Sequence, residues 1–145
     1  MKLIIDISEK YTEAEATIRC SRIDGEVQKI IDLIQNTDKL LIVQKDGATE
    51  KIRFNNVCYF ESVDELTFVY TEKTVYRCKE KLYELEELLE NSSFVRISKS
   101  CILNIDYLES VKAVFNGKLE ALLSNGEKVI INRHYVSAFK KKFGL

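Results

Sequence analysis

Three turn-forming dipeptides determine most of the course that this chain can take. Asp46-Gly47, Asn116-Gly117 and Asn125-Gly126 each separate two runs in which apolar and polar residues alternate. Such dipeptides favour type I′ turns, because both central residues need positive φ, and these turns join neighbouring antiparallel strands. The sequence therefore predicts a hairpin at each dipeptide, and the last two together predict a three-stranded meander over residues 110–132.

Further strands and two helices are predicted around these hairpins. The strand-like runs fall within residues 39–54, 56–63 and 65–78, and the helical patterns within 79–90 and 132–145. We therefore expect residues 39–145 to form a mainly antiparallel β domain with one internal and one terminal helix.

Both helices of this domain show an apolar face. The internal helix has a leucine stripe that should pack on a sheet, made of Leu82, Leu85, Leu88 and Leu89. Asn132 is suited to cap the terminal helix, in which Val136, Phe139 and Phe143 share one side. The lysines 140–142 either complement the dipole of this helix or belong to a helix at a membrane surface.

Residues 1–38 have a different pattern, which predicts a small β-β-α extension. Residues 1–7 and 13–20 resemble short strands, and residues 24–36 a helix with Asp24 as its N-cap. A unit of this size cannot bury a core alone. We expect it to pack on the rest of the chain or on a second copy, as a dimerisation or regulatory unit.

Several classes of protein are disfavoured by what the sequence lacks. No stretch approaches the ~20 apolar residues of a membrane helix, and the N-terminus does not resemble a signal peptide, so a cytoplasmic location is expected. The four cysteines are scattered and His134 is the single histidine, so no metal or other cofactor is expected and the cysteines should be buried and reduced. Without a phosphate loop or a G-x-S-x-G motif, an enzyme is not expected.

The charge is divided unevenly along the chain. Residues 1–90 carry a net charge of −6 and residues 91–145 a net charge of +5, although the total is only −1. A basic third on an acidic body predicts a directed electrostatic surface and not a chain that coats any polyanion.

Two short segments concentrate the features that suit an anionic partner. One contains Arg96, Ser98, Lys99 and Ser100, and the other contains Asn132, Arg133 and His134 at a predicted helix start. The N-terminus of a helix favours binding of phosphate. Arginine can bind phosphate or a guanine edge with two hydrogen bonds, and hydroxyl groups can add contacts to the nucleic-acid backbone. From the residues alone, nucleic-acid binding and a merely solvated basic edge remain equally open.

The same segments resemble the LytTR DNA-binding domain of bacterial transcription regulators, and the resemblance covers about residues 40–142. The family pattern F-x-R-x-H-R/K-S-x-x-V-N is matched by Phe94, Arg96, Lys99, Ser100 and Asn104. The pattern L-x-x-G-x-x-I-P-V-S-R is matched by Leu123, Gly126 and Arg133, and VCYFES resembles the strand I-x-Y-I-E-A/S. This chain departs from the family with Ser98 for histidine, Asn132 for serine and Ile131 for valine, and it lacks the proline.

The resemblance implies a ten-stranded β fold whose loops enter successive major grooves of double-stranded DNA. Two base-reading positions of the pattern fall on Lys99 and Arg133, while Arg96 and Ser100 would support the loop or touch phosphate. Asn104 is expected to hold a turn. In the family's third loop, residues 63–67 here, Glu65 could accept a hydrogen bond from a cytosine amino group.

The resemblance also bears on partners and regulation. It implies a compact class with a short N-terminal extension in place of a phosphoryl-receiver domain. Because that extension is too small to stand alone, we expect it to hold two copies together as a homodimer on promoter direct repeats. Members of that class are often paired with an inhibitory membrane protein. The alternative function is therefore a protein-interaction module that docks on such a membrane-bound partner and never binds DNA.

Overall fold

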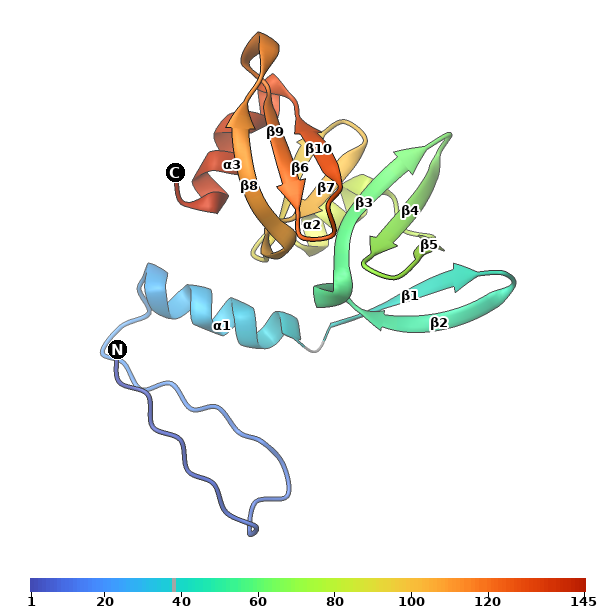
Figure 1. Ribbon diagram of the computed structural model, residues 1–145. Helices are drawn as coiled ribbons and strands as arrows, with labels where there is room; N and C mark the ends of the chain where they lie inside the picture. Colours follow the sequence, from blue (N-terminus) through green and yellow to red (C-terminus); the bar gives the residue numbers. More distant parts are fainter. Residues whose placement is uncertain (38) are drawn as a thin grey trace.

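The computed structural model describes residues 1–37 and 39–145. Its ten strands are all paired antiparallel, as predicted, and three α-helices accompany them (Figure 1). The elements are α1 Gly25–Thr37, β1 Leu40–Lys45, β2 Ala48–Arg53, β3 Val57–Val63, β4 Leu66–Thr71, β5 Val75–Cys78, α2 Leu82–Leu88, β6 Phe94–Ser98, β7 Cys101–Asn104, β8 Leu108–Ala113, β9 Leu119–Leu123, β10 Lys128–Ile131 and α3 Val136–Phe143.

The strands form two sheets. One has seven strands in the order β2-β1-β5-β4-β3-β7-β6, and the other is the predicted meander, β10-β9-β8. Both residues of Asp46-Gly47 and of Asn116-Gly117 take positive φ, as a type I′ turn requires, but at Asn125-Gly126 only Gly126 does. There the backbone N–H of Gly126 donates to Leu123 (2.9 Å), so this turn is of another type than predicted.

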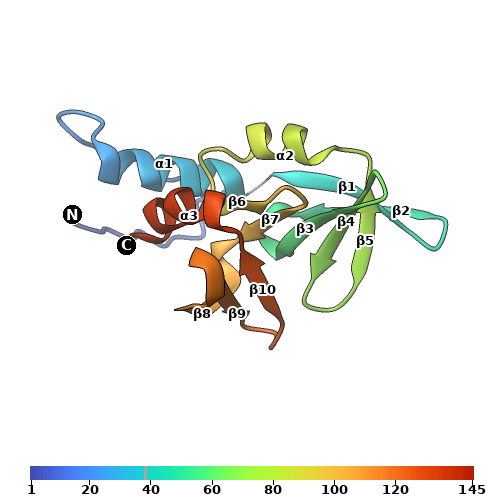
Figure 2. The same cartoon turned by 90° about the horizontal axis from the view of Figure 1, so that it is seen from above.

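The seven-stranded sheet is covered on both faces at the end formed by β3, β7 and β6. On one face α2 packs over Val43, Phe60 and Ile102. On the other, the three-stranded sheet and α3 pack over Ile97 and Leu103. Figure 2 shows α2 and the three-stranded sheet on opposite sides of the larger sheet. Strands β3, β6 and β7 are therefore buried on both faces, and each of them contributes residues to both cores.

The leucine stripe of α2 is confirmed except at one position. Leu82, Leu85 and Leu89 are buried, whereas the side chain of Leu88 is half exposed. Successive residues of a helix are rotated by about 100°, so Leu88 lies at the edge of the stripe that the other three define. Leu88 therefore stays partly in contact with solvent.

The terminal helix begins later than predicted. A 3-10 turn, Arg133–Tyr135, precedes α3, and the side chain of Asn132 makes no capping hydrogen bond. The expected Asn132 cap is therefore wrong: its backbone carbonyl, and not its side chain, accepts from Tyr135 (2.8 Å). Phe139 is buried as expected, and its ring stacks on Phe143 with centroids 5.6 Å apart.

Lys142 connects α3 by hydrogen bonds to the segment between α2 and β6. Its Nζ donates to the carbonyl oxygens of Glu90 (3.0 Å), Ser92 (2.8 Å) and Phe94 (2.9 Å), which lead from α2 into β6. Burial lowers the pKa of this ammonium, and Glu90 partly offsets that effect. Lys142 thus stabilises a loop of the protein, a role that neither interpretation of the lysine run anticipated.

The two N-terminal strands that the sequence predicts are not formed. Residues 1–24 carry no strand, and they run out and back below the domain (Figure 1). Their alternating apolar residues find no cover in the monomer, since Leu3 is 83% exposed and Ile7 90%. An isolated pair of strands is marginal in water. The predicted boundary between residues 38 and 39 falls at residue 38, outside the described residues.

The helical part of the extension does form. The carboxylate of Asp24 accepts from the backbone N–H of Val27 (3.0 Å), which confirms the predicted N-cap. Val27 is buried, and α1 contacts the 3-10 turn Phe54–Asn56 of the domain. Within the described residues no helix is long and apolar enough to cross a membrane.

Asn104 joins three parts of the domain from a fully buried position. Its Oδ1 accepts from the hydroxyl of Ser93 (2.7 Å) and the backbone N–H of Asp106 (3.1 Å). Its Nδ2 donates to the carbonyl of Val57 (2.9 Å). The predicted role of Asn104 in holding a turn is confirmed, and the same side chain also ties β7 to β3.

We predict that Asn104→Ala destabilises the fold strongly. The substitution leaves the buried carbonyl of Val57 and the partly buried hydroxyl of Ser93 without their partner, at about 1–3 kcal/mol for each unpaired group. Chemical denaturation followed by circular dichroism measures the loss. Asn55→Ala, at an exposed position, is the control and should change the free energy of unfolding by less than about 0.5 kcal/mol. A similar small change for Asn104→Ala would contradict the assigned role.

Candidate nucleic-acid interface

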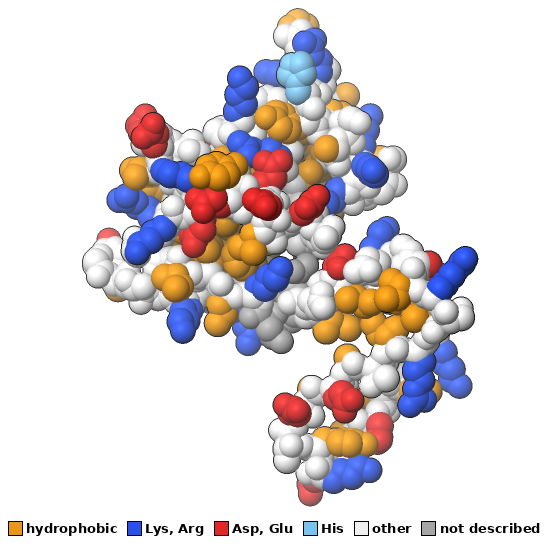
Figure 3. All heavy atoms as spheres, turned by 180° about the vertical axis from the view of Figure 1, so that it is seen from behind, with side chains coloured by type: hydrophobic (Ala, Val, Ile, Leu, Met, Phe, Trp, Pro, Cys, Tyr) orange, Lys and Arg blue, Asp and Glu red, His pale blue; other side chains and the backbone are white. Residues whose placement is uncertain are grey.

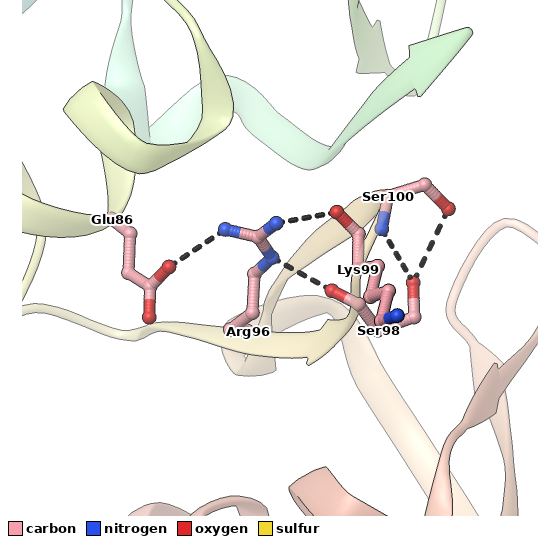
Figure 4. Close-up of polar contacts among 5 residues, drawn as sticks. All are labelled: Glu86, Arg96, Ser98, Lys99 and Ser100. Atoms are coloured by element: carbon pink, nitrogen blue, oxygen red, sulfur yellow. Dashed lines mark hydrogen bonds and ion pairs between the residues drawn. The ribbon is translucent and has the colours of Figure 1, made fainter.

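Lys99 and Ser100 form the two-residue turn between β6 and β7. The flanking residues Ser98 and Cys101 are paired across the hairpin. The Oγ of Ser98 accepts from the backbone N–H of Ser100 (3.1 Å) and lies 3.4 Å from its Oγ (Figure 4). Lys99 is exposed, so a rigid turn presents a cation and a hydroxyl to solvent.

The guanidinium of Arg96 is occupied by contacts within the protein. Its Nε donates to the carbonyl of Ser98 (2.7 Å), its Nη2 to the carbonyl of Lys99, and its Nη1 pairs with the carboxylate of Glu86 on α2 (2.7 Å) (Figure 4). The Arg96 side chain is only 18% exposed. It therefore positions the turn and is poorly placed to touch a ligand itself. This matches the first of the two roles expected for it.

The structure brings the two basic segments together. The backbone N–H of Asn132 donates to the carbonyl of Ile97 (2.9 Å), one residue before Ser98. Arg133 and His134 follow at once and are exposed, while Asn132 is half-buried. This hydrogen bond joins two residues that are 35 positions apart in the sequence. Lys99 follows Ile97 by two residues and Arg133 follows Asn132 by one, so the bond brings together the two segments that carry these cations.

Arg133 has a support that the sequence did not reveal. A side chain at Gly117, in the β8–β9 turn, would come within 3.1 Å of the Arg133 Cδ. The stem of Arg133 therefore lies directly against the backbone of that turn. The Asn-Gly dipeptide predicts a turn at this place, but no sequence signal links it to Arg133.

Glu65 lies on a separate hairpin at the same end of the larger sheet. The β3–β4 turn consists of Asp64 and Glu65, both with positive φ. The Ser62 N–H donates to the Ser100 carbonyl (2.8 Å), which sets this hairpin beside the β6–β7 turn. Glu65 is exposed, and its carbonyl accepts from the Nζ of Lys81 (2.8 Å). The turns β3–β4, β6–β7 and β8–β9 lie along the upper edge in Figure 1.

The charges of this edge suit an anionic partner. Lys and Arg side chains and the histidine gather near the end formed by the β8–β9 turn, while acidic side chains gather lower on the same face (Figure 3). Exposed cations, hydroxyls and a helix start can hold phosphates and can donate to base edges. No group of His, Cys, Asp and Glu suited to a metal ion occurs among the described residues.

The cysteines take no part in this surface. Burial raises the pKa of Cys101 to about 12, with Glu61 raising it further and Arg96 lowering it. Burial likewise raises the pKa of Cys58 to about 11 and that of Cys78 to about 12. These thiols stay protonated. Cys20 is exposed, against expectation, because residues 1–24 have no covering layer in the monomer.

Comparison with known proteins agrees with this architecture. The chain resembles an uncharacterized HTH-type transcriptional regulator of Staphylococcus aureus strain MSSA476, at 29% identity over 100% of this chain and 99% of that protein. The sensory transduction protein LytT of Enterococcus faecalis is 33% identical over 77% of this chain and 43% of its own length. A solved LytTr DNA-binding domain from Bacillus cereus superposes with a TM-score of 0.70 at 27% identity, covering 74% of this chain and 99% of that one.

The family model of the LytTr DNA-binding domain matches residues 47–144, which include every strand from β2 to β10 and both segments of the interface. This family is defined by DNA binding and is not a class of enzymes. Since the match covers most of the chain, the protein belongs to the LytTR DNA-binding domain family.

Proposed function

We propose that this protein is a cytoplasmic transcription regulator that binds double-stranded DNA in a sequence-specific manner, through turns that enter the major groove. One observation carries the proposal: the Asn132 N–H to Ile97 carbonyl bond sets the two family motifs side by side. With the two segments joined in this way, Lys99 and Arg133 are both exposed on the edge that carries the three turns. Relatives that match over their whole length are named transcriptional regulators.

In this proposal each residue of the interface has a distinct role. Lys99 and Arg133 read base edges, because both are exposed and long enough to enter a groove. Ser100 and His134 contact phosphates, and the backbone at the 3-10 turn Arg133–Tyr135 adds N–H donors. Arg96, Ser98 and Asn132 hold these elements in place. Glu65 accepts from a cytosine amino group when its hairpin reaches the neighbouring groove.

The fold supports recognition by turns instead of by a helix pair. Although the Staphylococcus relatives are named HTH-type regulators, consecutive α-helices in the described residues are separated by strands. The described residues therefore contain no helix-turn-helix. The elements available to enter a groove are the hairpin turns and the start of the terminal helix.

We further propose that two copies associate through residues 1–24. These residues hold exposed apolar side chains in alternation, and the monomer gives them no partner strand. A second copy supplies both a partner strand and apolar cover. Two linked domains bind adjacent half-sites with higher apparent affinity than one, which specific regulators generally need.

A titration with DNA from upstream of the protein's own gene tests the proposal. Fluorescence anisotropy compares this duplex with a scrambled duplex of equal length, at low and near-physiological salt. Preferential binding at the higher salt supports sequence-specific recognition. Equal binding to both duplexes that salt abolishes indicates only counterion release from a basic surface, and the regulator proposal would then be abandoned.

We predict that Arg133→Ala weakens binding to the preferred duplex by about 1–3 kcal/mol and relaxes one base preference, because a guanine loses its bidentate partner. Anisotropy on duplexes with each base pair changed in turn measures both effects. Arg53→Ala, which removes an exposed arginine from the far edge strand β2, should bind as the wild type does. Unchanged affinity and specificity for Arg133→Ala would remove Arg133 from the recognition surface.

Lys99→Ala is predicted to lower affinity for the preferred duplex by a similar ~1–3 kcal/mol, with little effect on the scrambled duplex. The matched control is Lys73→Ala, in the β4–β5 turn at the opposite end of the sheet. If Lys99 contacted phosphate instead, both duplexes would lose affinity equally and the salt slope would fall by about 0.9. That pattern would contradict base reading by Lys99.

The double variant Ile5→Asp with Ile7→Asp should convert a dimer to a monomer, because the charges oppose burial of the exposed apolar face. Light scattering at micromolar concentration measures the mass, and anisotropy the accompanying loss of affinity. Thr12→Asp, which adds one charge at an exposed polar position, should remain dimeric. A wild-type mass of one copy would refute association through residues 1–24.

A further inference from the structure

The tip of the β8–β9 hairpin carries an aromatic side chain in solvent. Phe115 is 85% exposed, more than any other large aromatic residue in the described chain. The turn that presents it is well defined: the Val114 N–H donates to the Lys118 carbonyl (3.0 Å), and Asn116 and Gly117 both have positive φ. Phe115 is thus held out from the protein by a closed turn and does not lie on a frayed loop.

This turn and Arg133 form one continuous surface. Because Gly117 lies against the Arg133 stem, a substituted Cβ there would meet the Cδ at 3.1 Å and the Cγ at 3.3 Å. Phe115 is two residues from this contact, and Lys118 adds an exposed cation one residue beyond it. Phe115 therefore lies on the same turn that supports the arginine proposed to read a base.

An exposed apolar residue requires no explanation by itself. Tyr83, on α2, is also 69% exposed, but it lies on the face opposite the three-stranded sheet. What distinguishes Phe115 is its position among cations on the proposed DNA side. In the major groove the apolar group that a protein can contact is the C5-methyl of thymine.

We propose that the β8–β9 turn is a further DNA-contacting element, and that Phe115 packs on a thymine methyl in the groove that Arg133 enters. The inference rests on the proposed DNA-binding function and extends it to a loop outside the two basic segments. Phe115 supplies apolar contact and Arg133 supplies hydrogen bonds, so together they read two neighbouring base pairs.

The test begins with a duplex that the full-length wild-type protein selects from a random pool. Each thymine of this duplex is replaced in turn by deoxyuridine, which removes only the methyl group. Anisotropy then measures the wild type, Phe115→Ala, Phe115→Leu, Arg133→Ala and the control Tyr83→Ala. Thermal unfolding of each variant verifies that the exposed substitutions leave the fold intact.

We expect Phe115→Ala to bind the selected duplex about four- to tenfold more weakly, with Phe115→Leu and Tyr83→Ala close to the wild type. One thymine replacement should weaken wild-type binding about fourfold, the value of one buried methyl. That same replacement should not weaken Phe115→Ala further, because the contact is already lost. This coupling is the result that a merely structural role for Phe115 would not produce.

Three other outcomes overturn the inference in distinguishable ways. If Arg133→Ala loses affinity while Phe115→Ala does not, the turn makes no contact and the DNA-binding function stands. If Phe115→Ala loses affinity without coupling to any thymine, the methyl contact is wrong. If the pool yields no preferred duplex and Arg133→Ala behaves as the wild type, the proposed function fails, and this inference with it.

Discussion

Burial of three neighbouring strands, β3, β7 and β6, on both faces is the constraint on which the rest of the structure depends. β3, β6 and β7 place consecutive apolar residues into two different cores. A sheet of this kind is stable only with a layer on each side. The helix α2 supplies one layer, and the three-stranded sheet with α3 supplies the other. That second layer brings the end of β10 against β6, so the pairing of the two basic segments follows directly from core packing.

Arg96 illustrates how a residue of a family motif can act within the protein, by holding a turn in place. Its guanidinium spans the β6–β7 turn and Glu86, and hydrogen bonds to charged groups are among the stronger ones in proteins. A turn held in this way presents Lys99 with little conformational freedom, which lowers the entropy lost on binding. Gly117 has no side chain, so the stem of Arg133 can lie directly against the backbone of the β8–β9 turn.

The N-terminal residues show where alternation of apolar residues is insufficient. Residues 1–7 have the period of a strand, yet no strand forms there. Residues 40–45 have a similar pattern and do form one, because β2 and β5 pair with them and α2 covers them. Periodicity indicates which face would be buried, but a strand also needs a partner for its backbone hydrogen bonds.

The sequence by itself determined the hairpins, most of the antiparallel strands of the β domain, the leucine helix and the two basic segments, because turn chemistry and periodicity are local properties of the chain. The number of ten strands was implied by the family resemblance. The sequence also pointed to the family, since motif residues are read directly. Only the tertiary structure decided that Arg96 is paired with Glu86, that Asn132 acts through its backbone, and that Gly117 lies against the stem of Arg133. These are contacts between residues on different elements, and their geometry depends on how two sheets pack, which no local pattern specifies.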